Sequence, residues 1–232
     1  MAPGGRSRSA TILRMTHPLL RVLTDAARGR PPAPDCSVEV LPPLPGPVDA
    51  VVVFTAHSYV AAAIEPGRLR SRLPPGDPGA PTEPQFLAWL ADELGRRAGQ
   101  LDAVLTAPAL GGPLPLDLEL EPRDDLAAHP RVARASRYRD DTRVLADPAG
   151  DLVLVLGRGV AGRWEVAFEV DPGRRGHGLG RALAAAARHL VPPDEPLFAQ
   201  VSPGNAASLR ALLAAGYTPI GSEVLFSKAT IP

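Results

Sequence analysis

The chain has 232 residues, including 28 prolines, 22 glycines and one cysteine, and its 25 basic side chains balance 25 acidic ones. A net charge of zero gives no overall field for a polyanion, so neither nucleic acid nor an anionic membrane is an expected partner. The prolines and glycines follow no repeat, which excludes a collagen-like chain. The lone Cys36 cannot form an internal disulfide, and no apolar stretch near Met1 has the length of a signal peptide or a membrane span. A cytoplasmic location is therefore expected.

The first half of the chain is predicted to consist of short helices and strands between proline-rich loops. Residues 1–15 begin with small, polar and basic side chains and are expected to be disordered. The apolar spacing of Phe86, Leu90 and Leu94 is typical of a helix. The elements expected in chain order are a helix at 16–28, strands at 37–41, 49–54 and 59–64, a long loop at 73–84, a helix at 83–98 and a strand at 101–106.

A proline and glycine cluster at 108–115 marks a predicted domain boundary. An N-terminal αβ subdomain would then occupy 16–112 and a second domain 115–228. The expected elements of the second domain are a strand at 116–120, a helical stretch at 124–139 and strands at 142–146, 152–156 and 164–170, followed by a helix, a strand, a helix and a last strand. This alternation predicts an α/β fold.

The strongest local motif is the glycine-rich segment 170–183, VDPGRRGHGLGRAL, between an alternating strand and an alanine-rich helix. Glycines at a strand-to-helix turn allow unusual backbone angles, and the free N–H groups at the start of the helix attract phosphate. Arg175 and Arg181 flank these amides and add positive charge. The segment therefore predicts a site for a pyrophosphate-bearing ligand.

Two common nucleotide motifs do not fit this segment. The dinucleotide pattern G-x-G-x-x-G fails because Arg181 and Leu183 stand where glycine is required, and the Walker loop fails because there is no lysine. A true G-x-G-x-x-G occurs at 157–162, but an alternating strand follows it, so these glycines are expected to turn a hairpin.

The segment resembles the pyrophosphate loop of the GNAT superfamily of acetyl-CoA-dependent N-acetyltransferases, R/Q-x-x-G-x-G/A preceded by V-x-P. Arg175, Gly178 and Gly180 fill the pattern, and Val170 and Pro172 fill its lead-in. A second block agrees, with Asn205-Ala-Ala-Ser208 after a strand, then a helix that ends in Gly216-Tyr217. The resemblance covers about 115–228. It implies a GNAT-like mixed central sheet flanked by helices, with 16–112 as an additional N-terminal αβ subdomain or a degenerate copy of the same fold.

The resemblance implies transfer of an acetyl group from acetyl-CoA to an amine by direct attack, with no acyl-enzyme. The coenzyme would bind to main-chain groups of the loop and of the preceding strand, together with Asn205 and Ser208. The residues implied in coenzyme binding are Phe168, Val170, Arg175, Gly176, His177, Gly178, Leu179, Gly180, Arg181, Asn205 and Ser208. Glu165 and Glu169 share one strand face and are the candidate general bases, although either could be an ordinary solvated carboxylate.

The resemblance supplies no tyrosine as the acid, because Leu212 occupies the position where many family members carry one. Ser208 or water would then protonate the leaving thiolate, or catalysis would be weak. Two alternatives follow: an acyl-CoA-binding sensor or interaction module without turnover, and transfer of an acyl group longer than acetyl. The expected partner is a small-molecule or peptide amine, with a homodimer as a further candidate assembly. The five scattered histidines predict no metal site.

Overall fold

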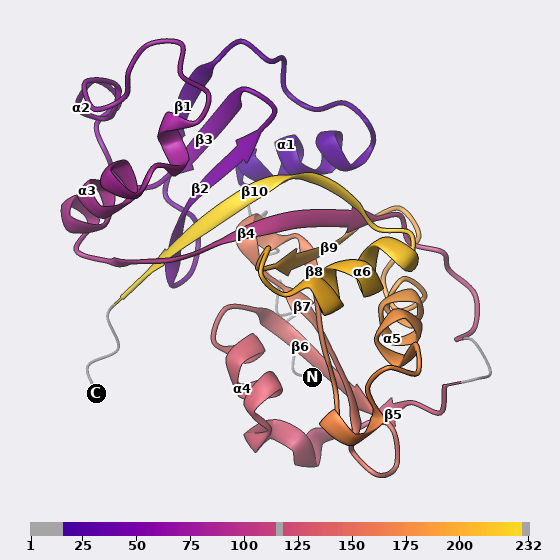
Figure 1. Ribbon diagram of the computed structural model, residues 1–232. Helices are drawn as coiled ribbons and strands as arrows, with labels where there is room; N and C mark the ends of the chain where they lie inside the picture. The colour runs from indigo at the N-terminus through magenta and orange to yellow at the C-terminus, as the bar shows by residue number, and fades with distance from the viewer. Residues whose placement is uncertain (1–15, 115–117, 229–232) are drawn as a thin grey trace, which may run out of the picture.

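The computed structural model describes residues 16–114 and 118–228, which form a ten-stranded mixed sheet with helices on both faces (Figure 1). The expected α/β class and mixed central sheet are confirmed. The strand order is β1-β3-β2-β10-β4-β9-β8-β7-β6-β5. The strands are β1 (Ser37–Leu41), β2 (Val48–Phe54), β3 (His57–Ala61), β4 (Arg97–Ala107), β5 (Glu121–Pro122), β6 (Asp140–Ala146), β7 (Leu152–Arg158), β8 (Trp164–Val170), β9 (Leu197–Val201) and β10 (Thr218–Ser227).

Six α-helices and four short 3-10 turns connect the described strands. The helices are α1 (Pro18–Ala27), α2 (Pro66–Arg70), α3 (Pro84–Leu94), α4 (Pro130–Ser136), α5 (Leu179–Ala187) and α6 (Ala206–Ala214). The 3-10 turns are η1 (Ala80–Thr82), η2 (Asp124–Ala128), η3 (Val160–Gly162) and η4 (Pro172–Arg174). No helix in 16–114 or 118–228 combines the length and apolar character needed to cross a membrane.

Strands from the two halves of the chain alternate in the middle of the sheet. β10 pairs with β2 and β4, and β4 pairs on its other side with β9, all antiparallel. Figure 1 shows β10 and β4 running side by side between the two ends of the fold. The sheet is thus continuous across the predicted boundary near 112, and the division into two domains stays a prediction. The predicted disorder at 1–15 lies outside the described residues.

The two faces of β7 carry different helices because its side chains alternate in direction. Val153 and Val155 pack with Val132 and Ala135 of α4. Leu154 and Leu156 belong instead to a cluster with α5 and α6, which includes Leu183 and Leu212. Helix α4 therefore lies on one face of this end of the sheet, and α5 and α6 lie on the other.

The predicted helix at 83–98 was too long and the predicted strand at 101–106 too short. Helix α3 ends at Leu94, and Gly95 follows in the left-handed conformation, with φ of +59°. Glycine adopts this conformation at little cost and commonly ends a helix. Strand β4 begins directly afterwards at Arg97. The apolar period that predicted the helix does not reveal where it stops.

Two further predictions, both for the second half of the chain, were wrong in part. Residues 118–120 of the predicted strand at 116–120 have no regular structure, and the strand β5 starts at Glu121; residues 116 and 117 lie outside the described part. The predicted helical stretch at 124–139 is divided into η2 and α4, because Pro130 starts a new helix whose N-cap is His129. The predicted hairpin at 157–162 is confirmed, since β7 and β8 pair antiparallel around η3.

Candidate active site

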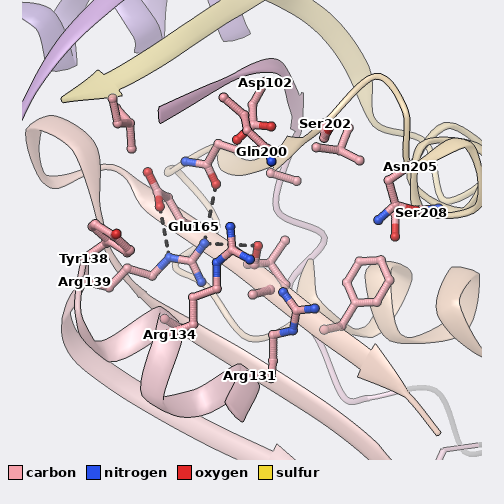
Figure 2. Close-up of a pocket in the computed structure, with 18 of the residues that line it drawn as sticks. Asp102, Arg131, Arg134, Tyr138, Arg139, Glu165, Gln200, Ser202, Asn205 and Ser208 are labelled. Atoms are coloured by element: carbon pink, nitrogen blue, oxygen red, sulfur yellow. Dashed lines mark hydrogen bonds and ion pairs between the residues drawn. The ribbon is translucent and has the colours of Figure 1, made fainter. Parts of the chain in front are cut away.

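A gap opens in the sheet between β8 and β9. These two parallel strands pair only at Trp164 with Leu197 and at Glu165 with Phe198. Beyond that point, among the described strands, β8 pairs with β7 alone and β9 pairs with β4 alone. A cavity of about 510 Å³ lies at the gap. It is lined from the α4 face by side chains such as Asp102 and Arg134, and from the α6 face by Ser208 and Leu212 (Figure 2).

The glycine-rich loop connects the end of β8 to α5. Gly176 and Gly178 have φ of +85° and +79°, and a Cβ atom at either position would meet nothing within 4 Å. Glycine is required there by the backbone angle rather than by neighbouring atoms. Gly180 lies inside α5, where a Cβ would contact Ala211 and Phe168 at 3.6 Å. The loop is therefore open above its first two glycines and packed closely at the third.

The main-chain N–H groups of residues 176–181 are free of protein acceptors within the described ranges. The first intrahelical donor is Ala182, whose N–H donates to the carbonyl of Gly178 at 3.1 Å. The amides at the start of a helix have no intrahelical acceptor, and the loop extends this series toward Gly176. Six consecutive donors at the positive end of a helix dipole form an anion site.

The cavity beside this loop has an excess of positive charge. It measures about 520 Å³, and Arg175, Arg181 and Arg210 line it. Arg175 is exposed and donates through Nε to the carbonyl of Val170 at 3.0 Å, which leaves the rest of its guanidinium group available. His177 folds back, with Nδ1 at 3.3 Å from the carbonyl of Arg174. Sequence analysis did not identify Arg210, which lies on α6 outside the glycine-rich motif.

The two cavities meet at the gap, because both are lined by Arg131, Phe168, Asn205 and Ser208. The side chain of Asn205 caps α6 by accepting a hydrogen bond from the N–H of Ser208 at 3.1 Å. This cap fixes the first turn of α6 beside the gap. All eleven residues predicted to bind coenzyme fall on or beside the loop, the end of β8 or the start of α6.

Glu165 lies at the cavity but is held by cationic neighbours. It is 3% exposed, and it accepts hydrogen bonds from Arg139 Nε at 2.9 Å, from Arg163 Nε at 2.9 Å and from the N–H of Val160 at 3.0 Å. Burial acts to raise the pKa of Glu165, but the charges of Arg163 and Arg139 outweigh it and hold that pKa below its usual value. A carboxylate so tightly paired is a poor proton acceptor. Gly159 leaves room for this carboxylate, since a Cβ there would overlap it.

The same ion pairs extend into the centre of the sheet. Arg163 Nη2 donates to both carboxylate oxygens of Glu223 at 2.8 Å, and the two residues are each 1% exposed. Burial raises the pKa of Glu223, and the charge of Arg163 opposes that rise. Arg163 therefore bridges two buried carboxylates, Glu165 on β8 and Glu223 on β10. Glu169, the other predicted base, pairs with Arg131 at 3.1 Å.

Asp102, on β4, is the carboxylate that sequence analysis missed. It is half-buried and lines the cavity at the gap, and it has no hydrogen bond or ion pair within 16–114 and 118–228. Burial raises the pKa of Asp102, while the charge of Arg134 opposes part of the rise. The local sequence of β4 carries no motif, so the position of Asp102 at the cavity follows from the pairing of β4 with β9.

Tyr217 is too deeply buried to take part in a reaction at the gap. It is 1% exposed, its hydroxyl donates to the carbonyl of Ala184 at 3.0 Å, and burial raises its pKa. Leu212 is buried at the cavity, where it offers no proton. The described residues also include no group of three or more histidine, cysteine, aspartate or glutamate side chains placed to hold a metal ion.

The mixed sheet, the loop before α5 and the Asn205 block before α6 occur in the order that the sequence resemblance implies. Solved structures that align include a GCN5-related N-acetyltransferase from Kribbella flavida, with 16% identity, 62% of this chain and 64% of that chain covered, and a TM-score of 0.40. A GNAT-family acetyltransferase from Colwellia psychrerythraea aligns with 11% identity, coverages of 61% and 62%, and a TM-score of 0.39.

A GNAT-family protein from Novosphingobium aromaticivorans aligns with 18% identity, coverages of 59% and 69%, and a TM-score of 0.39. The chain thus spans less than two thirds of the length of the first two of these structures. No protein-family model matches the chain, and no curated protein matches it.

Proposed function

We propose that the chain is an acyltransferase that moves the acetyl group of acetyl-CoA to an amine. The observation that carries this proposal is the row of free N–H groups at 176–181, in a cationic cavity that meets a second cavity through the gap between β8 and β9. The cavity beside the loop suits a diphosphate. The cavity at the gap, which Asp102 and Arg134 line, suits the amine that accepts the acetyl group, and we call it the acceptor cavity. The gap between them is the route by which a long, flexible ligand arm would connect the two.

The residues of the loop fit the diphosphate of coenzyme A. Its oxygens would accept hydrogen bonds from the N–H groups of 176–181, with Arg175 and Arg181 beside them and Arg210 across the cavity. The open space above Gly176 and Gly178 would take the phosphates. The unpaired edge of β8 beyond Glu165, including Phe168 and Val170, would contact the arm of the coenzyme.

Bound acetyl-CoA supplies a thioester that an amine can attack directly. In the transfer, the amine nitrogen bonds to the carbonyl carbon, the C–S bond breaks with its electron pair on sulfur, and the thiolate takes up a proton. An amine that arrives protonated must first lose a proton to a base. Asp102 is the base we favour over Glu165 and Glu169, because it is unpaired and its pKa is raised. Ser208, beside the gap, is the proposed donor to the thiolate.

Asp102→Asn is expected to lower kcat by on the order of a hundredfold or more, because general-base catalysis contributes about 10²–10⁴. The wild-type rate should rise with pH as Asp102 loses its proton, at a pH above the ordinary aspartate pKa of 3.8. The variant should lack that rise. Initial rates of CoA release across pH give the result, with Asp92→Asn on the exposed face of α3 as the control. Full kcat and an unchanged pH profile in Asp102→Asn would remove this residue from the mechanism.

The proposed function is tested by two measurements on the full chain. Calorimetric titration with acetyl-CoA should give saturable binding. CoA release should then be followed with a panel of small amines, amino acids, polyamines, aminoglycosides and peptide N-termini. Turnover of any member supports the transferase, whereas tight binding without turnover would identify an acyl-CoA sensor. Faster reaction with longer acyl-CoA thioesters would show that the transferred acyl group is longer than acetyl. Absence of binding would refute the whole proposal.

A further inference from the structure

The charged side chains around the acceptor cavity form ion pairs, except for two of them. Three arginines form four ion pairs with three carboxylates. They are Arg131 with Glu169 at 3.1 Å, Arg139 with Glu165 at 2.9 Å, and Arg163 with Glu165 and Glu223 at 2.9 and 2.8 Å. The three positive and three negative charges in these pairs sum to zero.

Asp102 and Arg134 are the two charged side chains that take no part in these ion pairs. Both line the cavity, and within 16–114 and 118–228 neither forms an ion pair. They come from different parts of the fold, since Asp102 lies on β4 and Arg134 on α4, and Figure 2 shows the cavity between these elements. The charge of Arg134 acts on the pKa of Asp102. One cavity therefore presents a free anion and a free cation that do not neutralise each other by contact.

A third group in the same cavity lacks a hydrogen-bond acceptor. The side chain of Arg139 is 9% exposed, and its Nη1 atom is buried with no acceptor in the described part of the chain. Its Nε and Nη2 atoms already donate, to Glu165 at 2.9 Å and to Gln200 at 3.4 Å. A buried donor without an acceptor is costly, and an anionic ligand group would offset that cost.

We propose that the acceptor is zwitterionic: an amine that also carries a carboxylate, such as a free α-amino acid. Its ammonium group would lie beside Asp102, and its carboxylate would lie beside Arg134, with Arg139 as a second donor. This inference rests on the proposed function and names its substrate class. The ammonium loses one proton to Asp102 and another as the C–N bond forms, the C–S bond breaks, and the thiolate takes up a proton. The products are an N-acetyl amino acid and CoA.

A carboxylate suits this arrangement better than a phosphate. The exposed guanidinium of Arg134 and the buried Nη1 group of Arg139 match the two oxygens of a carboxylate. A phosphate monoester carries close to two negative charges at neutral pH, whereas Arg134 is the one unpaired cation that lines this cavity among the described residues. A cavity of about 510 Å³ falls within the usual range for small-molecule sites, of roughly 300–1,000 Å³.

The test compares each amino acid with two analogues that keep the amine and lose the carboxylate. Leucine, leucinamide and 3-methylbutylamine form one such set, and phenylalanine, phenylalaninamide and phenethylamine form another. With saturating acetyl-CoA, CoA release should show kcat/KM at least about tenfold higher for a free acid than for its amide and amine. Phosphoethanolamine, which carries a phosphate, should react poorly. Equal or higher kcat/KM for the analogues that lack the carboxylate, or for phosphoethanolamine, would overturn the inference.

Arg134→Gln should lower kcat/KM for the preferred acid about tenfold, mainly through KM, and should change kcat/KM for the amide much less. Arg134 is exposed on α4, so this variant should fold normally. Arg137→Gln, on an exposed neighbour that lines neither cavity, is the matched control and should react as the wild type does. An equal effect of Arg134→Gln on acid and amide would contradict carboxylate recognition. If no acid reacts while acetyl-CoA still binds by calorimetry, the substrate class is wrong and the coenzyme site stands; loss of both refutes the proposed function itself.

Discussion

Gly178→Glu should reduce acetyl-CoA affinity by at least about a hundredfold. The backbone at Gly178 is left-handed, with φ of +79°, and a side chain there costs roughly 1–2 kcal/mol. The larger effect is electrostatic, because a carboxylate placed among the free N–H groups of 176–181 would occupy the anion site and repel the diphosphate. Losing two hydrogen bonds to a charged group costs about 1.5–3 kcal/mol each, which accounts for the expected change.

The control for this variant is Gly76→Glu. Gly76 has φ of +77°, and its Cβ would also meet nothing within 4 Å, so the conformational strain is matched. Gly76 lines neither cavity. Calorimetric titration should show wild-type affinity for Gly76→Glu and little heat for Gly178→Glu. Equal affinity in the two variants would mean that the amides of this loop do not bind the coenzyme.

Arg163→Met should lower the free energy of unfolding by about 3–5 kcal/mol, the cost of removing one member of a buried ion pair. Arg163 is 1% exposed and donates at 2.9 Å to Glu165 and at 2.8 Å to Glu223. Methionine fills part of the volume but leaves Glu223 charged and buried. Chemical denaturation followed by circular dichroism gives the midpoint and slope from which the change is calculated.

Two further variants separate the loss of charge from a general packing defect. Arg163→Met combined with Glu223→Gln should be more stable than Arg163→Met alone, because the buried charge is gone. Arg30→Met breaks the exposed contact with Asp25 and should change stability by no more than about 1 kcal/mol. A double variant no more stable than Arg163→Met would show that the buried charge is not what destabilises the protein.

The sequence predicted the loop and its neighbours because their signals are local. Gly176 and Gly178 are needed for left-handed backbone angles, and Asn205 is a helix cap, so both can be recognised without knowing what surrounds them. The hairpin at 157–162 was predicted for the same reason. The end of α3 and the start of α4 were missed because Gly95 ends one helix and Pro130 starts the other within an apolar pattern that runs on past them.

The acceptor cavity was not predictable in the same way. Asp102 and Arg134 meet at one cavity only because β4 pairs with β9 and α4 packs on β7, and these are contacts between distant parts of the chain. Glu165 was a candidate base because of its position on the strand that became β8. Its pairing with Arg139 and Arg163 depends on how the fold surrounds it, so the local pattern could not reveal its lowered pKa.

A crystal structure of the protein with bound coenzyme A would show where the diphosphate binds. The diphosphate oxygens should lie within hydrogen-bond distance of several N–H groups of 176–181, with the thiol end of the coenzyme directed into the gap between β8 and β9. A diphosphate bound elsewhere, with those N–H groups facing only solvent, would contradict the proposed coenzyme site.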